Sequence, residues 1–251
     1  MEKKRLDVLL VEKGLSPTRE KAQAMILAGE VFDDEGHRLE KPGTLLSVTK
    51  NIEIRSRTQP FKSRAGHKLQ FALESFSLEV NLKACMDIGA STGGFTHCLL
   101  KNGASHVVAV DVGYGQLDIE LRNHAQVTNL EKTNARHLQK EDIKDWGEKV
   151  ELAVIDVSFI SLQKVVEPLA GSFPNLKEWV LLFKPQFEVG PENIGKKGKV
   201  RSEEATQKSL LAFDEWMHQK GFKKKGGPIP SPVPGKKSGN IEYLFFYERG
   251  K

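Results

Sequence analysis

The sequence has few cysteines and lacks any long apolar run. Its 251 residues include two cysteines, Cys85 and Cys98, which leaves no disulfide framework and is typical of proteins in a reducing cytoplasm. The apolar stretch at residues 179–183 has the length of a strand, whereas a membrane-spanning helix needs about 18 apolar residues. The basic N-terminus is followed by charged residues, so we expect neither a signal peptide nor a membrane segment.

The sequence also lacks any group of histidines and cysteines with metal-ligand spacing, so we expect no metal site. Lysine and arginine outnumber the acids, which gives a net charge of +5 and an isoelectric point of about 9.0. That modest basicity is compatible with a polyanionic partner such as nucleic acid but does not require one. The length suits one large domain, or one large domain and one small one.

A glycine-rich turn follows the expected strand at residues 84–88. The turn reads Gly89-Ala90-Ser91-Thr92-Gly93-Gly94-Phe95-Thr96. Glycine has no Cβ, so such a turn lets the backbone approach a ligand closely. About twenty residues later a second apolar strand ends in Asp111, and an acid in this place holds the ribose of an adenosine in nucleotide-binding α/β folds. An ordinary turn that binds nothing is the alternative.

Asp87, directly before the turn, indicates which ligand is expected. A carboxylate there would repel the pyrophosphate of a dinucleotide but suits the sulfonium and amino groups of S-adenosylmethionine. The glycine spacing G-x-x-x-G-G also differs from the dinucleotide pattern G-x-G-x-x-G. We therefore predict S-adenosylmethionine as the cofactor, bound by Asp87, Gly89, Ser91, Thr92, Gly93, Gly94, Phe95, Asp111 and Asn134.

From residue 83 onwards, expected strands alternate with expected helices. Strands are predicted at 84–88, 107–111, 126–130, 151–156 and 179–183, with helices between them and a helix over 202–220. This alternation predicts an α/β fold with a doubly wound, mostly parallel sheet. Two further strand candidates follow, joined by a short Pro/Gly-rich loop, and such a connection makes the last pair antiparallel.

The N-terminal residues predict a small, separate α+β domain. Helices are expected over 5–14 and after Thr18, followed by short strands. The segments Arg5-Leu6-Asp7, Gly14-Leu15, Thr18-Arg19 and Lys41-Pro42-Gly43 resemble the S-four-like RNA-binding module, although the acidic residues 33–36 replace its usual turn. The resemblance implies RNA contacts from Lys4, Arg5, Thr18, Arg19 and Lys21. An accessory module without RNA contact is the alternative. We place this domain at 1–56, a linker at 57–63 and a larger domain at 64–251.

Polar residues gather at the ends of the expected strands in the larger domain. Asp156 and Lys184 each follow an apolar strand, Glu242 begins the last one, and Lys68 lies on the helix before the first. Ligands in open α/β sheets bind at the carboxyl ends of strands. A lysine there could remove the proton of a ribose hydroxyl, provided that its pKa falls well below the reference of ~10.4. A lone carboxylate after a strand is, however, often only a helix cap.

At these residues nearly the whole chain resembles the TlyA (haemolysin A-like) family of ribosomal RNA 2′-O-ribose methyltransferases, two-domain relatives of FtsJ-type enzymes. The resemblance rests on residues 63–69, 87–96, 156–162 and 184–188 and on Gly239-Asn240-x-Glu242. It implies a Rossmann-like S-adenosylmethionine-dependent methyltransferase sheet, a substrate of ribosomal RNA or ribosomal subunits, and a cytoplasmic location. It also implies a catalytic tetrad at Lys68, Asp156, Lys184 and Glu242, with Lys184 as the base. Ala65 departs from the family, which usually has glycine there.

A basic segment at residues 190–201 is expected to be a mobile loop beside the site. Together with Arg64, its Lys196, Lys197 and Lys199 are predicted to contact the RNA backbone, and a solvated charge run is the alternative. Competing hypotheses for the whole chain are a membrane-active haemolysin and a non-catalytic RNA-binding protein that keeps the fold. A base-methylating enzyme should carry an Asn-Pro-Pro-Tyr-like motif, whereas Asp156 is followed by Val-Ser-Phe.

Overall fold

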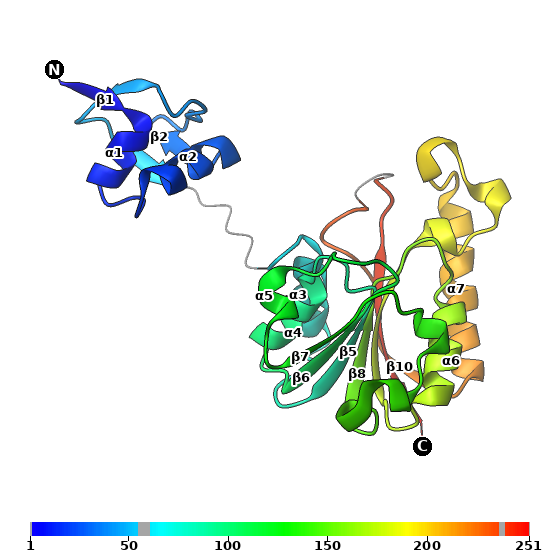
Figure 1. The fold of residues 1–251 in the computed structure, drawn as a ribbon. Coiled ribbons are helices and arrows are strands. Elements are labelled where there is room, and N and C mark those ends of the chain that lie inside the picture. Colours follow the sequence, from blue (N-terminus) through cyan, green and yellow to red (C-terminus); the bar gives the residue numbers. More distant parts are fainter. Residues whose placement is uncertain (1, 55–60, 236–238, 251) are drawn as a thin grey trace. The chain divides into compact units, whose positions relative to one another are not determined.

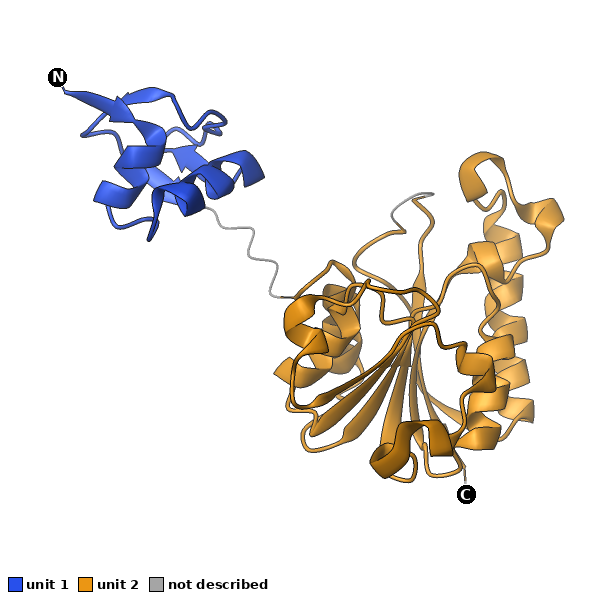
Figure 2. Ribbon diagram, in the orientation of Figure 1, with its two compact units in different colours: residues 1–58 blue, residues 59–251 orange. Residues whose placement is uncertain are grey.

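The structure is a computed structural model that describes residues 2–54, 61–235 and 239–250. The chain divides into two units, Met1–Thr58 and Gln59–Lys251 (Figure 2). Of the linker predicted at 57–63, residues 57–60 lie outside the described part of the chain. Phe61 is only 7% exposed and packs in the core of the second unit. The folded part of that unit therefore begins before Arg64.

The first unit is a small α+β fold. Its elements are β1 (Lys3–Arg5), α1 (Leu6–Glu12), α2 (Arg19–Ala28), β2 (Val31–Asp33), β3 (Leu45–Ser47) and β4 (Ile52–Ile54). The strands pair antiparallel, β1 with β3 and β2 with β4, and α1 and α2 contribute Leu10 and Ile26 to the core. The sequence predicted a helix from residue 5, but Arg5 ends β1. Its partner in the pairing, Leu45, is distant in the sequence, so no local pattern reveals this strand.

Both ends of α2 follow from local sequence. The Thr18 hydroxyl accepts a hydrogen bond from the Lys21 backbone N–H at 3.2 Å, as expected of an N-cap. Gly29 ends the helix at φ 75°, a conformation that glycine adopts without a steric penalty.

A buried carboxylate, Asp7, connects the basic side chains of the first unit. Its Oδ1 accepts from Arg5 Nε at 3.0 Å, and its Oδ2 accepts from Arg19 Nε at 2.9 Å and Gln23 Nε2 at 2.8 Å. The hydrogen bonds from Arg5 are the main reason that the pKa of Asp7 lies below its usual range, although burial opposes them. Because this pKa is lowered, the stabilisation is complete above the unfolded pKa of about 3.9 and is lost as the pH falls further.

Seven strands of the second unit form one sheet in the order β10-β11-β9-β8-β5-β6-β7 (Figure 1). The strands are β5 (Ala84–Ile88), β6 (His106–Val110), β7 (Val127–Leu130), β8 (Val150–Ile155), β9 (Glu178–Phe183), β10 (Phe222–Pro230) and β11 (Tyr243–Arg249). β5 to β9 are parallel, whereas β11 is antiparallel to both β9 and β10. The predicted α/β fold and the antiparallel last pair are confirmed.

Helices cover both faces of this sheet. They are α3 (Ala65–Ser75), α4 (Gly94–Lys101), α5 (Ile119–Arg122), α6 (Gln163–Ser172) and α7 (Glu203–Gln219). Alternate residues of β8 enter different cores: Leu152 packs with α3 and α4, and Ala153 packs with α6 and α7. A strand buried on both faces reads as a continuous apolar run, which is why these strands were visible in the sequence.

The segment between β7 and β8 differs from the expectation of an α-helix. It forms two 3₁₀ helices, Ala135–His137 and Lys140–Trp146. Asn134 caps the first through its side chain, and Lys144 interrupts the second at φ 38°. Local capping thus replaces a regular crossover helix here. Within the described residues, no helix is long and apolar enough to cross a membrane.

We expect Asp7→Asn to destabilise the first unit. The amide presents a donor to Arg5 and Arg19 where the carboxylate accepted, so the free energy of opening should fall by about 1–3 kcal/mol. Hydrogen exchange of the α2 backbone amides in the full chain measures this. Glu40→Gln, which changes an exposed acid 3.7 Å from Arg38, is the matched control. Unchanged α2 protection in Asp7→Asn would contradict the role of Asp7.

Candidate active site

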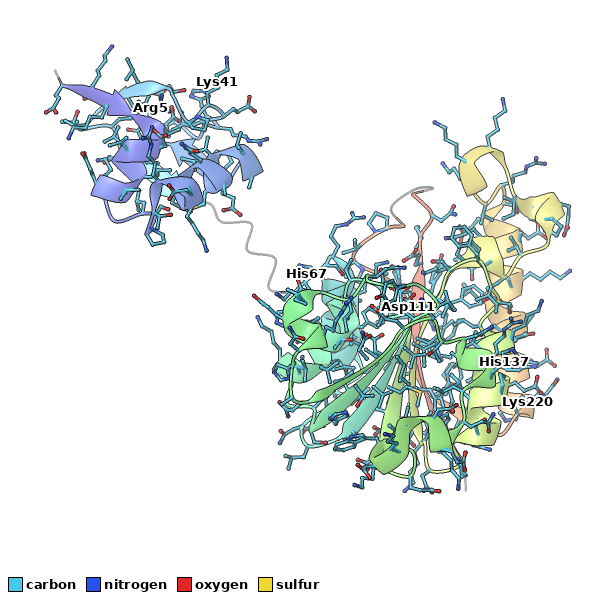
Figure 3. The ribbon with its side chains drawn as sticks, in the orientation of Figure 1. Arg5, Lys41, His67, Asp111, His137 and Lys220 are labelled. Atoms are coloured by element: carbon cyan, nitrogen blue, oxygen red, sulfur yellow. The ribbon has the colours of Figure 1, made fainter. Side chains whose placement is uncertain are left out.

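A cavity of about 930 Å³ opens at the carboxyl ends of the parallel strands. The chain proceeds from β5 to β6 and β7 on one side and from β8 to β9 on the other, so the strand order reverses between β5 and β8. Ligands of open α/β sheets bind at such a switch point. Asp111, directly after β6, lines the cavity and lies at this edge of the sheet (Figure 3).

The turn after β5 lies against the loop after β8. Gly89 has φ 84°, and a Cβ at this position would lie 2.4 Å from the carbonyl oxygen of Asp156. Only glycine fits such an approach. The Ser91 N–H donates to Asp111 Oδ2 at 2.8 Å, and the Gly113 N–H donates to Asp111 Oδ1 at 2.7 Å. These two amides fix the Asp111 carboxylate at the rim of the cavity.

Four of the predicted cofactor residues line the cavity: Gly89, Ser91, Asp111 and Asn134. Asn134 also accepts a hydrogen bond from the Arg136 backbone N–H at 3.1 Å. The remaining predicted residues, Asp87, Thr92, Gly93, Gly94 and Phe95, are not among the side chains and backbone atoms that line it.

Asp87, Gly93 and Gly94 make packing contacts around the turn. Asp87 is completely buried and accepts a hydrogen bond from the Thr96 hydroxyl at 2.6 Å; burial raises its pKa to about 7. A Cβ on Gly93 would lie 2.2 Å from the Leu121 side chain, and one on Gly94 would lie 2.9 Å from the Gly66 nitrogen. These glycines therefore allow α4 to pack closely against α5 and α3.

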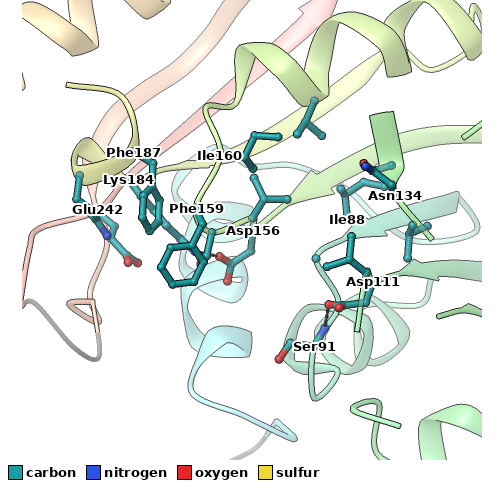
Figure 4. Close-up of a pocket in the computed structure, with 18 of the residues that line it drawn as sticks. Ile88, Ser91, Asp111, Asn134, Asp156, Phe159, Ile160, Lys184, Phe187 and Glu242 are labelled. Atoms are coloured by element: carbon teal, nitrogen blue, oxygen red, sulfur yellow. Dashed lines mark hydrogen bonds and ion pairs between the residues drawn. The ribbon is translucent and has the colours of Figure 1, made fainter. Parts of the chain in front are cut away.

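The four residues of the predicted tetrad all line this cavity. Lys184, directly after β9, places its Nζ 2.5 Å from Asp156 Oδ1 and donates to the Ser158 hydroxyl at 2.9 Å. Lys68, on α3, forms an ion pair with Glu242, directly before β11. Figure 4 shows Asp156, Lys184 and Glu242 on one side of the cavity, with Ser91, Asp111 and Asn134 on the other.

Each of the two ion pairs joins one lysine to one carboxylate and is neutral as a pair. Lys68 and Lys184 are each only 8% exposed, and Glu242 is 3% exposed. Burying charges is costly unless each has a partner of opposite sign. One carboxylate for each ammonium meets that need, and both pairs face the same cavity.

Two phenylalanines and one glutamate near the tetrad were not given a role from the sequence. Phe159 is 83% exposed, and its ring lies 5.2 Å from that of Phe187; both line the cavity. Glu188 Oε1 accepts from the Leu162 N–H at 2.8 Å, and burial raises the pKa of Glu188 to about 7. This contact joins the turn after β9 to the start of α6. All three lie in segments 156–162 and 184–188, on which the family resemblance rests. That resemblance was the signal in the sequence that could have indicated a role for them.

The predicted RNA-binding residues differ in their surroundings. In the first unit, Lys4 pairs with Glu12 at 2.9 Å, and Lys21 is exposed. Arg5 and Arg19 share Asp7, and Thr18 caps α2, as described above. In the second unit, Arg64, Lys196 and Lys199 are exposed, and Lys197 lines the cavity.

The first unit also contains three side chains that could together reach one metal ion, Asp33, Glu35 and His37. No histidine–cysteine spacing in the sequence pointed to them. Lys50 lies 2.7 Å from Asp34 and 3.1 Å from Glu35, so this acidic turn already has a cationic partner.

Family models match both units. The model described as the FtsJ-like methyltransferase matches residues 61–249, and the S4 domain matches residues 4–48. These matches confirm the resemblance and the fold class predicted from the sequence.

Individual relatives match along nearly the whole chain. The chain is 44% identical over 243 residues to the 16S/23S rRNA (cytidine-2′-O)-methyltransferase TlyA of Mycobacterium tuberculosis, a match that covers 96% of this chain and 88% of that one. It is 42% identical over 240 residues to Hemolysin A of Brachyspira hyodysenteriae, which covers 96% and 98%. A solved structure from Streptococcus thermophilus, described as a hemolysin, is 39% identical with a TM-score of 0.73, covering 100% of this chain and 90% of that one.

We expect Gly89→Ala to lower the free energy of unfolding of the second unit by about 2–3 kcal/mol, because it adds a Cβ at positive φ against a backbone oxygen. The three tryptophans, Trp146, Trp179 and Trp216, all lie in this unit, so urea denaturation followed by their fluorescence reports it selectively. Gly171→Ala is the control, since a Cβ there has nothing within 4 Å. Equal midpoints for both variants would refute the close approach.

Proposed function

Because the chain belongs to the FtsJ-like methyltransferases, and among them to the TlyA (hemolysin A) family, we propose that it methylates a ribose 2′-hydroxyl of ribosomal RNA. The observation that carries this proposal is the placement of Lys68, Asp156, Lys184 and Glu242 around the same cavity as Gly89 and Asp111. A base for a sugar hydroxyl and a cradle for a nucleoside thus share one site. The Mycobacterium tuberculosis relative is described as a 16S/23S rRNA (cytidine-2′-O)-methyltransferase.

The residues present fit S-adenosylmethionine, the methyl donor of this family. A cavity of about 930 Å³ has room for a cofactor of that size and for part of a nucleotide. Gly89 leaves the backbone accessible, and Asp111 lies after the next strand, where a carboxylate can accept hydrogen bonds from ribose hydroxyls. Asn134 would lie beside the adenine. When bound, the cofactor supplies a methyl group activated by its sulfonium.

Lys184 is the proposed base. Its ion-paired ammonium form first releases a proton to solvent. As an amine, Nζ then accepts the proton of the 2′-hydroxyl while that oxygen attacks, because an alcohol is too weak an acid to react without such help. The lysine thereby becomes an ammonium ion, and the Asp156 carboxylate at 2.5 Å stabilises the new charge. Ser158, the acceptor of a hydrogen bond from the same Nζ, fixes its direction. This chemistry uses no metal ion.

Lys68 and Glu242, which line the same cavity as Lys184, would help to hold the ribose. Lys68 can donate to ribose oxygens, and its pairing with Glu242 fixes its orientation. Phe159 presents an exposed ring beside the tetrad, and we propose that the target base stacks on it. Base–aromatic stacking contributes about 1–3 kcal/mol per base.

The first unit is proposed to supply RNA affinity. Arg5 and Arg19 have side chains that are 46% and 52% exposed while Asp7 orients them, and Lys21 lies nearby on α2. Arginines fixed in this way contact phosphates bidentately at low entropic cost. We also propose a cytoplasmic location, because an rRNA substrate is found where ribosomes are assembled.

The proposed function is tested by incubating the protein with labelled S-adenosylmethionine and separated ribosomal subunits, followed by nucleoside mapping. Label on a ribose 2′-oxygen supports the proposal. Label on a base, or none on either subunit, would refute it.

Lys184→Ala should lower methyl transfer to ribosomal subunits by at least about 10²-fold, the usual contribution of a general base. S-Adenosylmethionine affinity should stay within a few-fold, because Gly89 and Asp111 are untouched. Single-turnover rates and calorimetric cofactor binding measure the two effects. Lys208→Ala, on the exposed side of α7, serves as the control. A wild-type rate in Lys184→Ala would exclude Lys184 as the base.

Replacing Lys196, Lys197 and Lys199 together by alanine should weaken RNA binding and flatten its salt dependence. Each lost phosphate contact lowers the slope of log K against log[salt] by about 0.7–0.9, so a decrease of about two to three is expected. Binding titrations with ribosomal RNA at several salt concentrations measure it. Alanines at Lys223, Lys224 and Lys225 on β10 remove the same charge elsewhere. An equal slope in the wild type and in the 196/197/199 variant would show that the loop lies away from the RNA.

A further inference from the structure

The segment at residues 190–201, called here the basic loop, has a regular backbone. Ile194 and Val200 form an antiparallel bridge, the Gly195 N–H donates to the Lys199 carbonyl at 2.7 Å, and the Arg201 N–H donates to the Asn193 carbonyl at 2.9 Å. The loop was expected to be mobile. Its described backbone bonds to itself, and its three lysines are exposed.

One buried side chain outside the loop joins it to the segment before β11. Asn240 is 7% exposed, and its Nδ2 donates to the Gly198 carbonyl at 2.8 Å while its Oδ1 accepts from the Val200 N–H at 3.1 Å. An asparagine amide offers one donor group and one acceptor, and both ends bond to backbone on either side of Lys199. An aspartate, which has acceptors only, could not make this pair of contacts.

The same segment carries a catalytic side chain. Asn240 lies two residues before Glu242, the partner of Lys68, and the Glu242 carbonyl accepts from the Ser231 N–H at 2.8 Å. Lys197, Gly198 and Glu242 all line the cavity. The basic loop and the Lys68–Glu242 pair therefore belong to one wall of the active site, and Asn240 connects them.

The backbone conformation of Lys197 indicates that the loop is constrained by its surroundings. It has φ 60°, which is unfavourable for a residue with a side chain unless its surroundings impose it. The hydrogen bond from Asn240 to the next residue, Gly198, provides such a constraint. Lys197 is thereby held at the cavity edge with its side chain exposed.

From these contacts we propose that Asn240 is a positioning residue that holds the basic loop over the RNA strand next to the target ribose. The proposal rests on the proposed function, since it assigns the loop an RNA ligand. Asn240 itself does not contact the RNA. It fixes the backbone from which Lys197 and Lys199 reach phosphates, and it keeps this backbone at a constant position relative to Glu242. RNA that is bound by the loop therefore has its target ribose at the tetrad.

The test compares Asn240→Ala and Asn240→Asp with the wild type, using steady-state methylation of ribosomal subunits and calorimetric binding of S-adenosylmethionine. Asn240→Ala should raise KM for the subunits about tenfold, because two backbone contacts are lost. Asn240→Asp, which places a carboxylate oxygen against the Gly198 carbonyl, should raise it at least as much. Cofactor affinity should stay within twofold. Asn175→Ala, which removes an exposed amide bonded to Glu148 at 2.9 Å, is the control and should leave KM within twofold.

A double-mutant cycle separates positioning from a merely structural role. Asn240→Ala is combined with the alanine variant at 196, 197 and 199; if Asn240 acts through these lysines, the combined variant has the KM of the lysine variant alone. Multiplicative effects on KM, an unchanged KM in Asn240→Ala, or loss of cofactor binding in both Asn240 variants would each overturn the inference. Absence of methylation by the wild-type protein would instead refute the proposed function, so the two failures are distinguishable.

Discussion

The close approach of the loop after β8 to the turn after β5 is the constraint on which the site depends. Gly89 lies so near the Asp156 carbonyl that no Cβ fits between them. The Asp156 N–H donates to the Ile88 carbonyl at 2.9 Å, so the same residue is bonded to β5 by its backbone. Its side chain reaches Lys184 on the other side. The glycine turn and the proposed base are thus joined through one residue, and neither can shift without moving the other.

Both units use carboxylates to orient cations, but burial gives the cations different roles. Asp7 is buried, whereas its partners Arg5 and Arg19 have side chains that are about half exposed. Such arginines keep donors directed to solvent and suit a polyanion. Lys68 and Lys184, in contrast, are nearly enclosed. Their amines can act only on a group that enters the cavity, which suits chemistry rather than general affinity.

Much of the fold could be predicted from local pattern, because β5, β6, β8 and β9 are largely buried and read as apolar runs. Asp111, Asp156 and Lys184 could be assigned to one edge of the sheet because polar residues that follow such strands must meet there. Other features depend on contacts between distant segments. β1 pairs with β3, Gly94 makes room for α3, and Asn240 reaches Gly198, and none of these partners is marked by spacing. The hydrogen bond from the Thr96 hydroxyl to Asp87 is likewise not marked by any spacing in the sequence.

The sequence by itself determined where the buried strands of the larger sheet lie, where the glycine turn lies and which acids and lysines follow those strands, because these are properties of neighbouring residues. The tertiary structure alone decided which of those polar groups face the cavity and with which partner. Lys68 pairs with Glu242 and Lys184 with Asp156, and the opposite pairing has the same composition and spacing. The pairing depends on the strand order β11-β9-β8-β5, which places Asp156, after β8, beside Lys184, after β9. The order of residues along the chain does not show which strands are neighbours in the sheet.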